Sequence, residues 1–344
     1  MTTVVSLTEG LRSLVDRFLR AEPATLFYQS DAYRSLLCAL LGAHDRTLVA
    51  ISDSGAVEGV LPLLERDGPF GRVLNSLPYY GSNGGVIAAS AGACAQLVAA
   101  YDDLATAPGT LGATVVSNPF GGDDPVVHNL SDERVAQFTP IADGDEETIL
   151  ASVDPSARRN VKKARRAGYA VEADDTALSD LAALHEANIA AIGGRPKERR
   201  FFELVGERLV PGEHYDVWTA RRDGALGAAL LVFYWSTVAE YFTPAIDARH
   251  RTDQPLAAIL AAALPAAAAR GIETWNWGGT WTTQESLYRF KRKWGALERR
   301  YMYRVQVNDE RVLAMSSGEI LAAYPEFYVA PFSSLKEAAP SPSS

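Results

Sequence analysis

The sequence has little of what disulfide-stapled, membrane-spanning and secreted proteins depend on. Its two cysteines, Cys38 and Cys94, fall in stretches with apolar neighbours, which favours core thiols over a disulfide and fits a reducing compartment. The longest apolar run, residues 256–269, is mostly alanine, contains Pro265 and is too short to span a bilayer. The N-terminal residues lack the hydrophobic run of a signal peptide. We therefore expect a soluble, cytoplasmic protein with no membrane span.

The histidine content and the net charge argue against two further classes of protein. The five histidines show no ligand spacing, so we predict no metal site. We also predict no cofactor. The formal net charge of -9 argues against a general polyanion binder, although it leaves room for a local basic surface.

The order of predicted elements indicates an α+β protein built from two similar halves. At 344 residues the chain has the length of about two domains. Each half runs from helices through an antiparallel meander to a long helix and a final strand; the long helices are predicted at residues 90–107 and 254–270. We predict tandem duplicated domains with mixed, mostly antiparallel sheets flanked by helices. Their predicted bounds are residues 1–145 and 146–337, followed by a disordered tail at 338–344.

A lysine interrupts the apolar face of a helix predicted over residues 283–294. Thr282 and Glu285 form a capping-box pattern at its start. The positions that would face the core, at i, i+3, i+4 and i+7, are Leu287, Phe290, Lys291 and Trp294. A cation against an apolar wall must find a partner or change its pKa. Lys291 therefore either extends its ammonium to water from the edge of the stripe or belongs to a site.

The turn before this helix favours a site. Residues 272–277 alternate apolar and polar side chains as a strand does, and Asn276, Trp277, Gly278 and Gly279 form its carboxyl end and the turn that follows. Strand ends followed by glycine-rich turns often bind ligands, because the backbone can approach closely and N–H groups are left free. We therefore predict a substrate site beside Lys291.

Three segments carry a resemblance to a known family. The order of elements resembles the acetyltransferase fold called GNAT, duplicated in one chain. Residues 287–296, Leu-Tyr-Arg-Phe-Lys-Arg-Lys-Trp-Gly-Ala, resemble the Phe-Lys signature of the Fem family, the aminoacyl-tRNA-dependent peptidoglycan bridge transferases. Residues 158–168 and 77–85 are similar to that family's basic helix and acceptor-side loop. The resemblance covers about residues 25–307 and implies acyl transfer, with Phe290 and Lys291 in the site.

One stretch departs from the acetyl-CoA-dependent members of this fold. Those members carry an Arg-x-x-Gly-x-Gly turn before the long helix, whose amides bind the pyrophosphate. Here residues 249–256 are Arg-His-Arg-Thr-Asp-Gln-Pro-Leu, which include no glycine, a proline without an N–H, and Asp253 with a repelling charge. The resemblance to the Fem family therefore implies charged tRNA as the donor, in place of acyl-CoA.

A helix predicted over residues 155–167 concentrates positive charge on an acidic protein. Its cations are Arg158, Arg159, Lys162, Lys163, Arg165 and Arg166, and a nearby loop adds Arg195, Lys197, Arg199 and Arg200. One interpretation is a solvated face balanced by acidic neighbours. The other is a surface for the phosphates of a tRNA acceptor stem or a nucleotide-linked substrate, with Arg158, Arg159 and Lys162 as binding residues.

Aromatic residues complete the predicted substrate site. Tyr79, Tyr80 and Asn83 lie in a glycine-rich loop, where they form either an acceptor wall or part of the core. With a GNAT fold, Tyr241 would point near the central cleft and Trp277 would lie at its side.

We therefore predict a Fem-like acyltransferase that moves an aminoacyl group from aminoacyl-tRNA to the amine of a cell-wall precursor or of a small biosynthetic molecule or peptide. Lys291 is the predicted catalytic residue, as a cation that stabilises a tetrahedral oxyanion. Two alternatives stay open. One is an acyl-CoA-dependent N-acyltransferase acting on a nucleotide sugar or secondary metabolite, and the other is a non-catalytic binding protein of the same fold.

Overall fold

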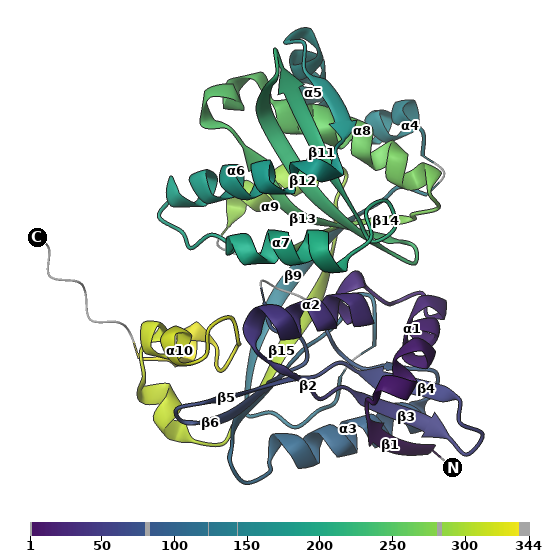
Figure 1. Cartoon of the computed structure of the whole chain (residues 1–344), viewed down its shortest axis with the longest axis vertical. Helices are drawn as coiled ribbons and strands as arrows, with labels where there is room; N and C mark the ends of the chain where they lie inside the picture. The colour runs from purple at the N-terminus through teal and green to yellow at the C-terminus, as the bar shows by residue number, and fades with distance from the viewer. Residues whose placement is uncertain (1, 80–82, 123, 143, 281–283, 337–344) are drawn as a thin grey trace, which may run out of the picture. The chain divides into compact units, whose positions relative to one another are not determined.

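The computed structural model describes residues 2–79, 83–122, 124–142, 144–280 and 284–336, which form two compact units (Figure 1). Unit 1 comprises Met1–Arg134 and Arg300–Ser344, and unit 2 comprises Val135–Arg299. The predicted bounds differ, because they assigned the whole of residues 146–337 to the second domain. The predicted tail at 338–344 lies outside the described residues. Among the helices of the described ranges, none combines the length and the apolarity needed to cross a bilayer.

Unit 1 combines two groups of strands with helices. The strands β1, β3, β4 and β7 form one sheet, and β15, β8, β6, β5 and β2 follow one another in a second. The helices are η1 (Glu9–Leu11), α1 (Arg12–Ala21), η2 (Phe27–Gln29), α2 (Asp31–Leu41), α3 (Ala91–Ala105), η5 (Glu310–Ala314), α10 (Ser317–Ala323) and η6 (Phe332–Ser334). The strands are β1 (Thr2–Ser6), β2 (His44–Asp45), β3 (Leu48–Ser52), β4 (Val57–Leu61), β5 (Leu64–Gly68), β6 (Gly71–Asn75), β7 (Ile87–Ala88) and β8 (Thr110–Val116).

Unit 2 contains strands in the order β10, β11, β12, β13, β14, β9. Helix α6 packs against β12 and β13, and α8 packs against the same sheet with α4 and α5 beside it (Figure 1). The strands are β10 (Ala170–Ala173), β11 (Tyr215–Arg222), β12 (Ala225–Trp235), β13 (Val238–Ile246) and β14 (Thr274–Thr280). The helices are α4 (Glu146–Ser152), α5 (Pro155–Arg166), η3 (Asp175–Ala177), α6 (Leu178–Ala190), α7 (Arg199–Arg208), η4 (Ala248–Asp253), α8 (Pro255–Ala269) and α9 (Glu285–Arg292). Two strands, β9 (Leu130–Pro140) and β15 (Leu297–Val307), contribute residues to both units.

The predicted duplication and α+β class are confirmed by a shared crossover. In unit 1, β6 leads through the short strand β7 and α3 to β8, and β6 and β8 pair in parallel. In unit 2, β13 leads through α8 to β14, again with parallel pairing. The other strand pairs within the two units are antiparallel among those that the structure describes. The two units therefore share a parallel crossover through a long helix, as the meander, long helix and strand pattern predicted.

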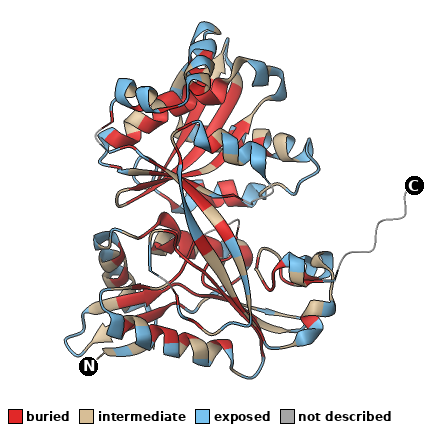
Figure 2. Ribbon diagram, turned by 180° about the vertical axis from the view of Figure 1, so that it is seen from behind, coloured by how far each residue is buried: buried red, intermediate tan, exposed pale blue. Residues whose placement is uncertain are grey.

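The core of unit 2 forms where the alanine-rich helix α8 lies on the sheet. Ile259, Leu260 and Leu264 are fully buried, and the alanines between them allow close approach of α5 and of the strands. Figure 2 shows buried residues along these central strands. The core places β14 firmly between β13 and β9, and β14 carries the candidate site at its carboxyl end.

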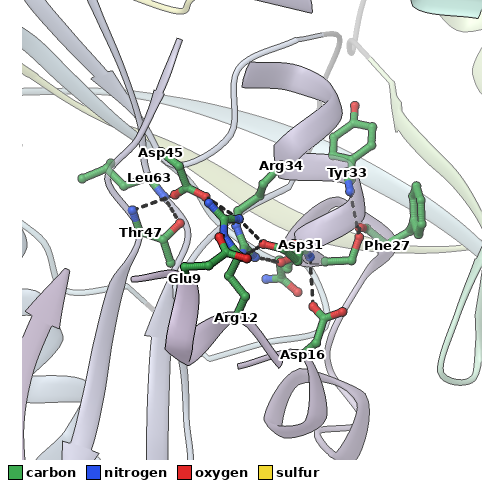
Figure 3. Close-up of polar contacts among 12 residues, drawn as sticks. Glu9, Arg12, Asp16, Phe27, Asp31, Tyr33, Arg34, Asp45, Thr47 and Leu63 are labelled. Carbon is green, nitrogen blue, oxygen red and sulfur yellow. Dashed lines mark hydrogen bonds and ion pairs between the residues drawn. The ribbon is translucent and has the colours of Figure 1, made fainter. Parts of the chain in front are cut away.

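A buried charge network holds the N-terminal helices of unit 1 (Figure 3). Arg34, on α2, is fully buried and donates to the Gln29 carbonyl, to Asp31 Oδ1 at 3.2 Å and to Asp45 Oδ2 at 3.4 Å. Arg12, on α1, also donates to Asp31. One guanidinium thus satisfies two carboxylates and a carbonyl from three elements, a geometry that suits its fixed fork of donors.

Candidate active site

Lys291 is the buried residue of α9. Its side chain is only 2% exposed, whereas Leu287 is 37% exposed, so the prediction that Leu287 faces the core is wrong. Phe290 is partly buried against the core, and Trp294 is 2% exposed. Helix α9 begins at Glu285 after Gln284, which makes no side-chain cap, and the predicted cap Thr282 lies outside the described residues. The lysine therefore points inward from a short helix whose other charged residues face solvent.

The Lys291 ammonium sits in a cage of three acceptors at the end of β14. Its Nζ donates to Thr280 Oγ1 at 2.7 Å, to the Gly279 carbonyl at 3.1 Å and to the Gly278 carbonyl at 3.2 Å. An ammonium has three N–H groups, so all of its donors are used. Among the described residues no carboxylate forms an ion pair with it. Burial lowers the pKa of Lys291 to about 7, because desolvation disfavours the charged form.

The parallel strands β13 and β14 separate just before the glycine turn that contacts Lys291. β13 and β14 pair only at Val238–Glu240 with Thr274–Asn276. Immediately beyond, each strand has a register shift against its other neighbour: β13 shifts against β12 at Phe242, and β14 shifts against β9 at Trp277. Bulges of this kind re-aim side chains and are frequent beside active sites. The glycines that follow, Gly278 and Gly279, thus lie on backbone that is not paired with β13.

Asn276 fixes the start of the turn. Its Nδ2 donates to Glu240 Oε2 at 2.8 Å, and its Oδ1 accepts from Gly278 N at 3.0 Å. Gly278 has φ of 72°, the left-handed region that glycine adopts without strain. Asn276 and Glu240 are both fully buried, so Asn276 positions the backbone and does not face solvent.

Trp277 is the centre of an aromatic wall under the turn. Its ring contacts those of Tyr241 at 4.9 Å, Phe290 at 6.1 Å and Trp294 at 6.5 Å between centroids. Its Nε1 donates to Thr139 Oγ1 at 2.9 Å. Trp277 and Tyr241 are both buried, and burial raises the pKa of the Tyr241 hydroxyl far above its usual value. Unit 2 therefore brings together six predicted site residues around Lys291, namely Tyr241, Asn276, Trp277, Gly278, Gly279 and Phe290.

Side chains in the segment before α8 contact other elements of unit 2. Asp253 pairs with Arg222 at 2.8 Å just before the helix, and Pro255 stands at its first turn. The preceding residue, Gln254, is left-handed with φ of 64° and makes no side-chain cap. His250 Nδ1 is 2.7 Å from the Tyr169 hydroxyl. A helix start that lacks one N–H and has a carboxylate beside it is a poor pyrophosphate site.

The cations of α5 divide into two groups. Arg158 donates to the carbonyls of Leu150, Ala151 and Val153 and so caps α4, and Arg165 pairs with Glu146 at 2.6 Å. The other four are exposed, and among the described residues they form no hydrogen bond or ion pair. They recur at i, i+3, i+4 and i+7, on one face of the helix. This group, the basic stripe, consists of Arg159, Lys162, Lys163 and Arg166.

The other cations of the predicted basic region, in residues 195–200, have partners of their own. Arg199 pairs with Glu186 at 2.9 Å, and Arg200 bonds Glu207 at 2.7 Å. Lys197 Nζ lies over the Phe242 ring at 5.1 Å. The interpretation as a solvated, balanced face thus fits Arg199 and Arg200, whereas both interpretations stay open for the basic stripe.

The predicted acceptor loop belongs to unit 1. Tyr79 is buried with φ of 81°, and Asn83 is 1% exposed and donates through Nδ2 to the Ser117 carbonyl at 2.9 Å. Tyr80 lies outside the described residues. Asn83 thus holds the loop to the end of β8, and its role in acceptor binding stays a prediction.

Two residues at the site were missed from the sequence. Gln137, on β9, and Thr280, at the end of β14, are both buried and hydrogen-bonded to each other at 3.0 Å. Thr280 follows the two glycines directly, so the predicted turn could have included it. Gln137 had no such signal, because β9 itself was not predicted.

Comparison with known proteins identifies the fold. Residues 155–292 match the family model described as acetyltransferase (GNAT) domain. The structure of FemX superposes with a TM-score of 0.69 at 15% identity, covering 88% of this chain and 97% of that one. A tandem GNAT protein from the clavulanic acid biosynthesis pathway has a TM-score of 0.52 at 14% identity, with 89% and 98% covered.

A conserved protein of unknown function from Bacteroides thetaiotaomicron VPI-5482 gives a TM-score of 0.59 at 12% identity, with 89% and 100% covered. No curated protein sequence matches this chain. At these identities the similarity concerns the fold. The chain has a Fem-like, tandem GNAT-type acyltransferase fold, as the Phe-Lys segment and the order of elements predicted.

Proposed function

We propose that this protein is an acyltransferase that forms an amide by moving an aminoacyl group from aminoacyl-tRNA to an amine. The observation that carries the proposal is the buried Lys291 ammonium, held at the point where β13 and β14 part. The acceptor class is an amine of a cell-wall precursor or of a small biosynthetic molecule or peptide. FemX, which shares the fold, supports acyl transfer of this type.

The reaction would need little covalent help from the protein. The acceptor amine attacks the ester carbonyl of the charged tRNA, the tetrahedral oxyanion collapses, and the C–O bond to the terminal ribose breaks. The amine proton passes to solvent or to the departing ribose oxygen. Aminolysis of an activated ester is downhill, so positioning and oxyanion stabilisation are the main requirements.

Lys291 would supply the stabilising charge. Two of its three acceptors, the Gly278 and Gly279 carbonyls, are at 3.2 and 3.1 Å, longer than usual for a charged donor. A developing oxyanion is a stronger acceptor than a peptide carbonyl and would replace one of them. Burial strengthens this interaction, because the local dielectric is low.

The α8 N-terminus and the basic stripe support tRNA over acyl-CoA as donor. Asp253 and Pro255 weaken the helix start where a pyrophosphate would bind. The four cations of the basic stripe are free to neutralise phosphates, and α5 adjoins α9 through the bond from Asp154 N to the Lys293 carbonyl at 2.8 Å. Phosphates held on α5 would thus lie on the element next to the Lys291 helix.

The donor is tested by incubation with total tRNA charged with labelled amino acids and, separately, with labelled acyl-CoA. We expect labelled amide from at least one charged tRNA and weak or no binding of acetyl-CoA in a calorimetric titration. A micromolar dissociation constant for acetyl-CoA together with transfer to an amine would make the acyl-CoA-dependent alternative the better assignment. Absence of transfer from every donor would favour the non-catalytic alternative.

Replacement of Arg159 and Lys162 by glutamine should weaken tRNA binding without unfolding α5, since both side chains are exposed. Each lost phosphate contact should reduce the slope of log K against log salt by about one. Binding is measured at several salt concentrations. The double variant Arg199→Gln/Arg200→Gln is the control, because it changes the net charge equally at cations already paired with glutamates. If the slope of log K against log salt is the same in both double variants, the basic stripe is better interpreted as a solvated face.

A further inference from the structure

A chain of hydrogen bonds links Lys291 to Thr280 on β14, then to Gln137 on β9, and returns to α9. Lys291 Nζ donates to Thr280 Oγ1 at 2.7 Å, the shortest of its three bonds. Thr280 Oγ1 in turn donates to Gln137 Oε1 at 3.0 Å. Gln137 Nε2 donates to the Tyr288 carbonyl at 3.3 Å, one turn before Lys291 on the same helix. The chain therefore closes on the helix that carries the lysine.

The order of donors in this chain fixes the Thr280 hydroxyl as an acceptor for Lys291. The Gln137 amide must direct its NH₂ to the Tyr288 carbonyl, which cannot donate, and so its oxygen faces Thr280. The hydroxyl hydrogen of Thr280 is then committed to Gln137. Only lone pairs remain toward Lys291, and these favour an N–H of the charged ammonium.

We infer that Thr280 and Gln137 are positioning residues, which anchor the Lys291 ammonium and keep it charged while a substrate oxyanion replaces one of the glycine carbonyls. This inference rests on the proposed function. Thr280 and Gln137 are 2% and 0% exposed, so neither would touch the substrate. They act through Lys291. If the ammonium keeps its hydrogen bond to Thr280, it can exchange the bond to a glycine carbonyl for one to the oxyanion and stay in position.

The titratable groups on the elements around Lys291 either contact other residues or face solvent. Glu240, on β13, accepts from Asn276, and the Tyr288 hydroxyl donates to Glu298 of β15 at 2.7 Å. On α9, Arg289 is 3.8 Å from Glu285, and Arg292 and the following Lys293 are exposed. Burial lowers the pKa of Lys291. Removal of the Thr280 hydroxyl should therefore change the pKa of Lys291 directly, because this hydroxyl accepts the shortest hydrogen bond of the ammonium.

The test is the titration of the lysine side chains by NMR, which does not require activity. The protein has six lysines, so ¹³Cε-labelled lysine gives few signals, and the Lys291→Met variant identifies the one that belongs to Lys291. In the wild type this signal should titrate near pH 7. In Thr280→Val, which loses the hydroxyl and keeps the shape, its midpoint should fall by about one to two pH units, the size of a hydrogen bond to a charged group. Gln137→Leu should lower it in the same direction.

Thr139→Val is the matched control. Thr139 is likewise a buried threonine of this strand pair, but its hydroxyl links Trp277 to the Trp294 carbonyl and does not contact Lys291. Its replacement should leave the Lys291 midpoint unchanged. Thr280→Ser, which restores the hydroxyl, should recover the wild-type value.

Turnover supplies a second readout. In Thr280→Val the pH profile of transfer should move to lower pH by the amount seen in the NMR titration, with about a 10-fold loss at neutral pH. An unchanged Lys291 midpoint in Thr280→Val, or an equal fall in Thr139→Val, would overturn the inference. If the protein transfers no acyl group but the Lys291 midpoint is still lower in Thr280→Val, the proposed function is rejected and the positioning of Lys291 by Thr280 stands. The two failures are therefore distinguishable.

Discussion

Replacement of Lys291 by methionine is expected to lower turnover at neutral pH by about 10²-fold or more, which is the size of losing one preorganised oxyanion donor. Methionine keeps the aliphatic length and removes the charge. The fold should persist, because the variant removes a buried cation whose desolvation is already unfavourable. The measurement is single-turnover transfer beside thermal unfolding of the same preparation.

Lys293→Met is the matched control for this variant. Lys293 lies two residues away on the same segment, and its side chain is exposed. Its replacement should leave turnover within about twofold of the wild type, since surface charges contribute little. A soluble Lys291→Met protein with wild-type rates would reject Lys291 as the catalytic residue. Lower stability with normal turnover would instead assign it a purely structural role.

The largest effect on stability is expected from Arg34→Met in unit 1. The change removes the fully buried guanidinium that Asp31, Asp45 and the Gln29 carbonyl share, and leaves the two partly buried carboxylates with Arg12 alone (Figure 3). Removing one partner of a buried ion pair typically costs about 3–5 kcal/mol. We therefore expect the free energy of unfolding of unit 1 to fall by about that amount.

The units can be followed separately in the same experiment. All six tryptophans lie between Trp218 and Trp294, in unit 2, so their fluorescence reports that unit, whereas far-UV circular dichroism reports both. Arg34→Met should shift the dichroism transition in urea more than the fluorescence transition. Arg200→Met, which removes a 48% exposed partner of Glu203 and Glu207, should change stability by at most about 1 kcal/mol. Equal effects of the two variants would contradict a stabilising role for the buried network.

Much of the fold could be predicted from the sequence because local pattern and tertiary structure agree. The hairpin turn at Asp223-Gly224 and the apolar runs beside it predicted β12 at residues 225–235, as observed. The strand β9 was missed, because its first half, Leu-Ser-Asp-Glu-Arg, carries three charged residues and shows no apolar alternation. β9 contributes residues to both units, so the predicted bounds, made without it, differ from the two compact units.

The site could be predicted where its residues lie close together in the sequence. Lys291, Phe290 and the two glycines lie within 14 residues of one another, and the helical period placed Lys291 on the apolar stripe of its helix. Its partners Gln137 and Thr280 depend on strand register, which the sequence does not specify by itself. Arg158 was predicted to bind phosphate, but its guanidinium caps α4, a contact set by how α4 and α5 pack.

The most direct test of the role of Lys291 is the pH dependence of single-turnover transfer, divided by the neutral fraction of the acceptor amine. The ammonium is the active form in the proposed mechanism, and its pKa is about 7. We predict that the corrected rate is constant below this value, falls as the pH rises through it, and shows no such step in Lys291→Met. A corrected rate that instead rises through the same pH would mean that the neutral amine acts as a base, and would contradict oxyanion stabilisation by Lys291.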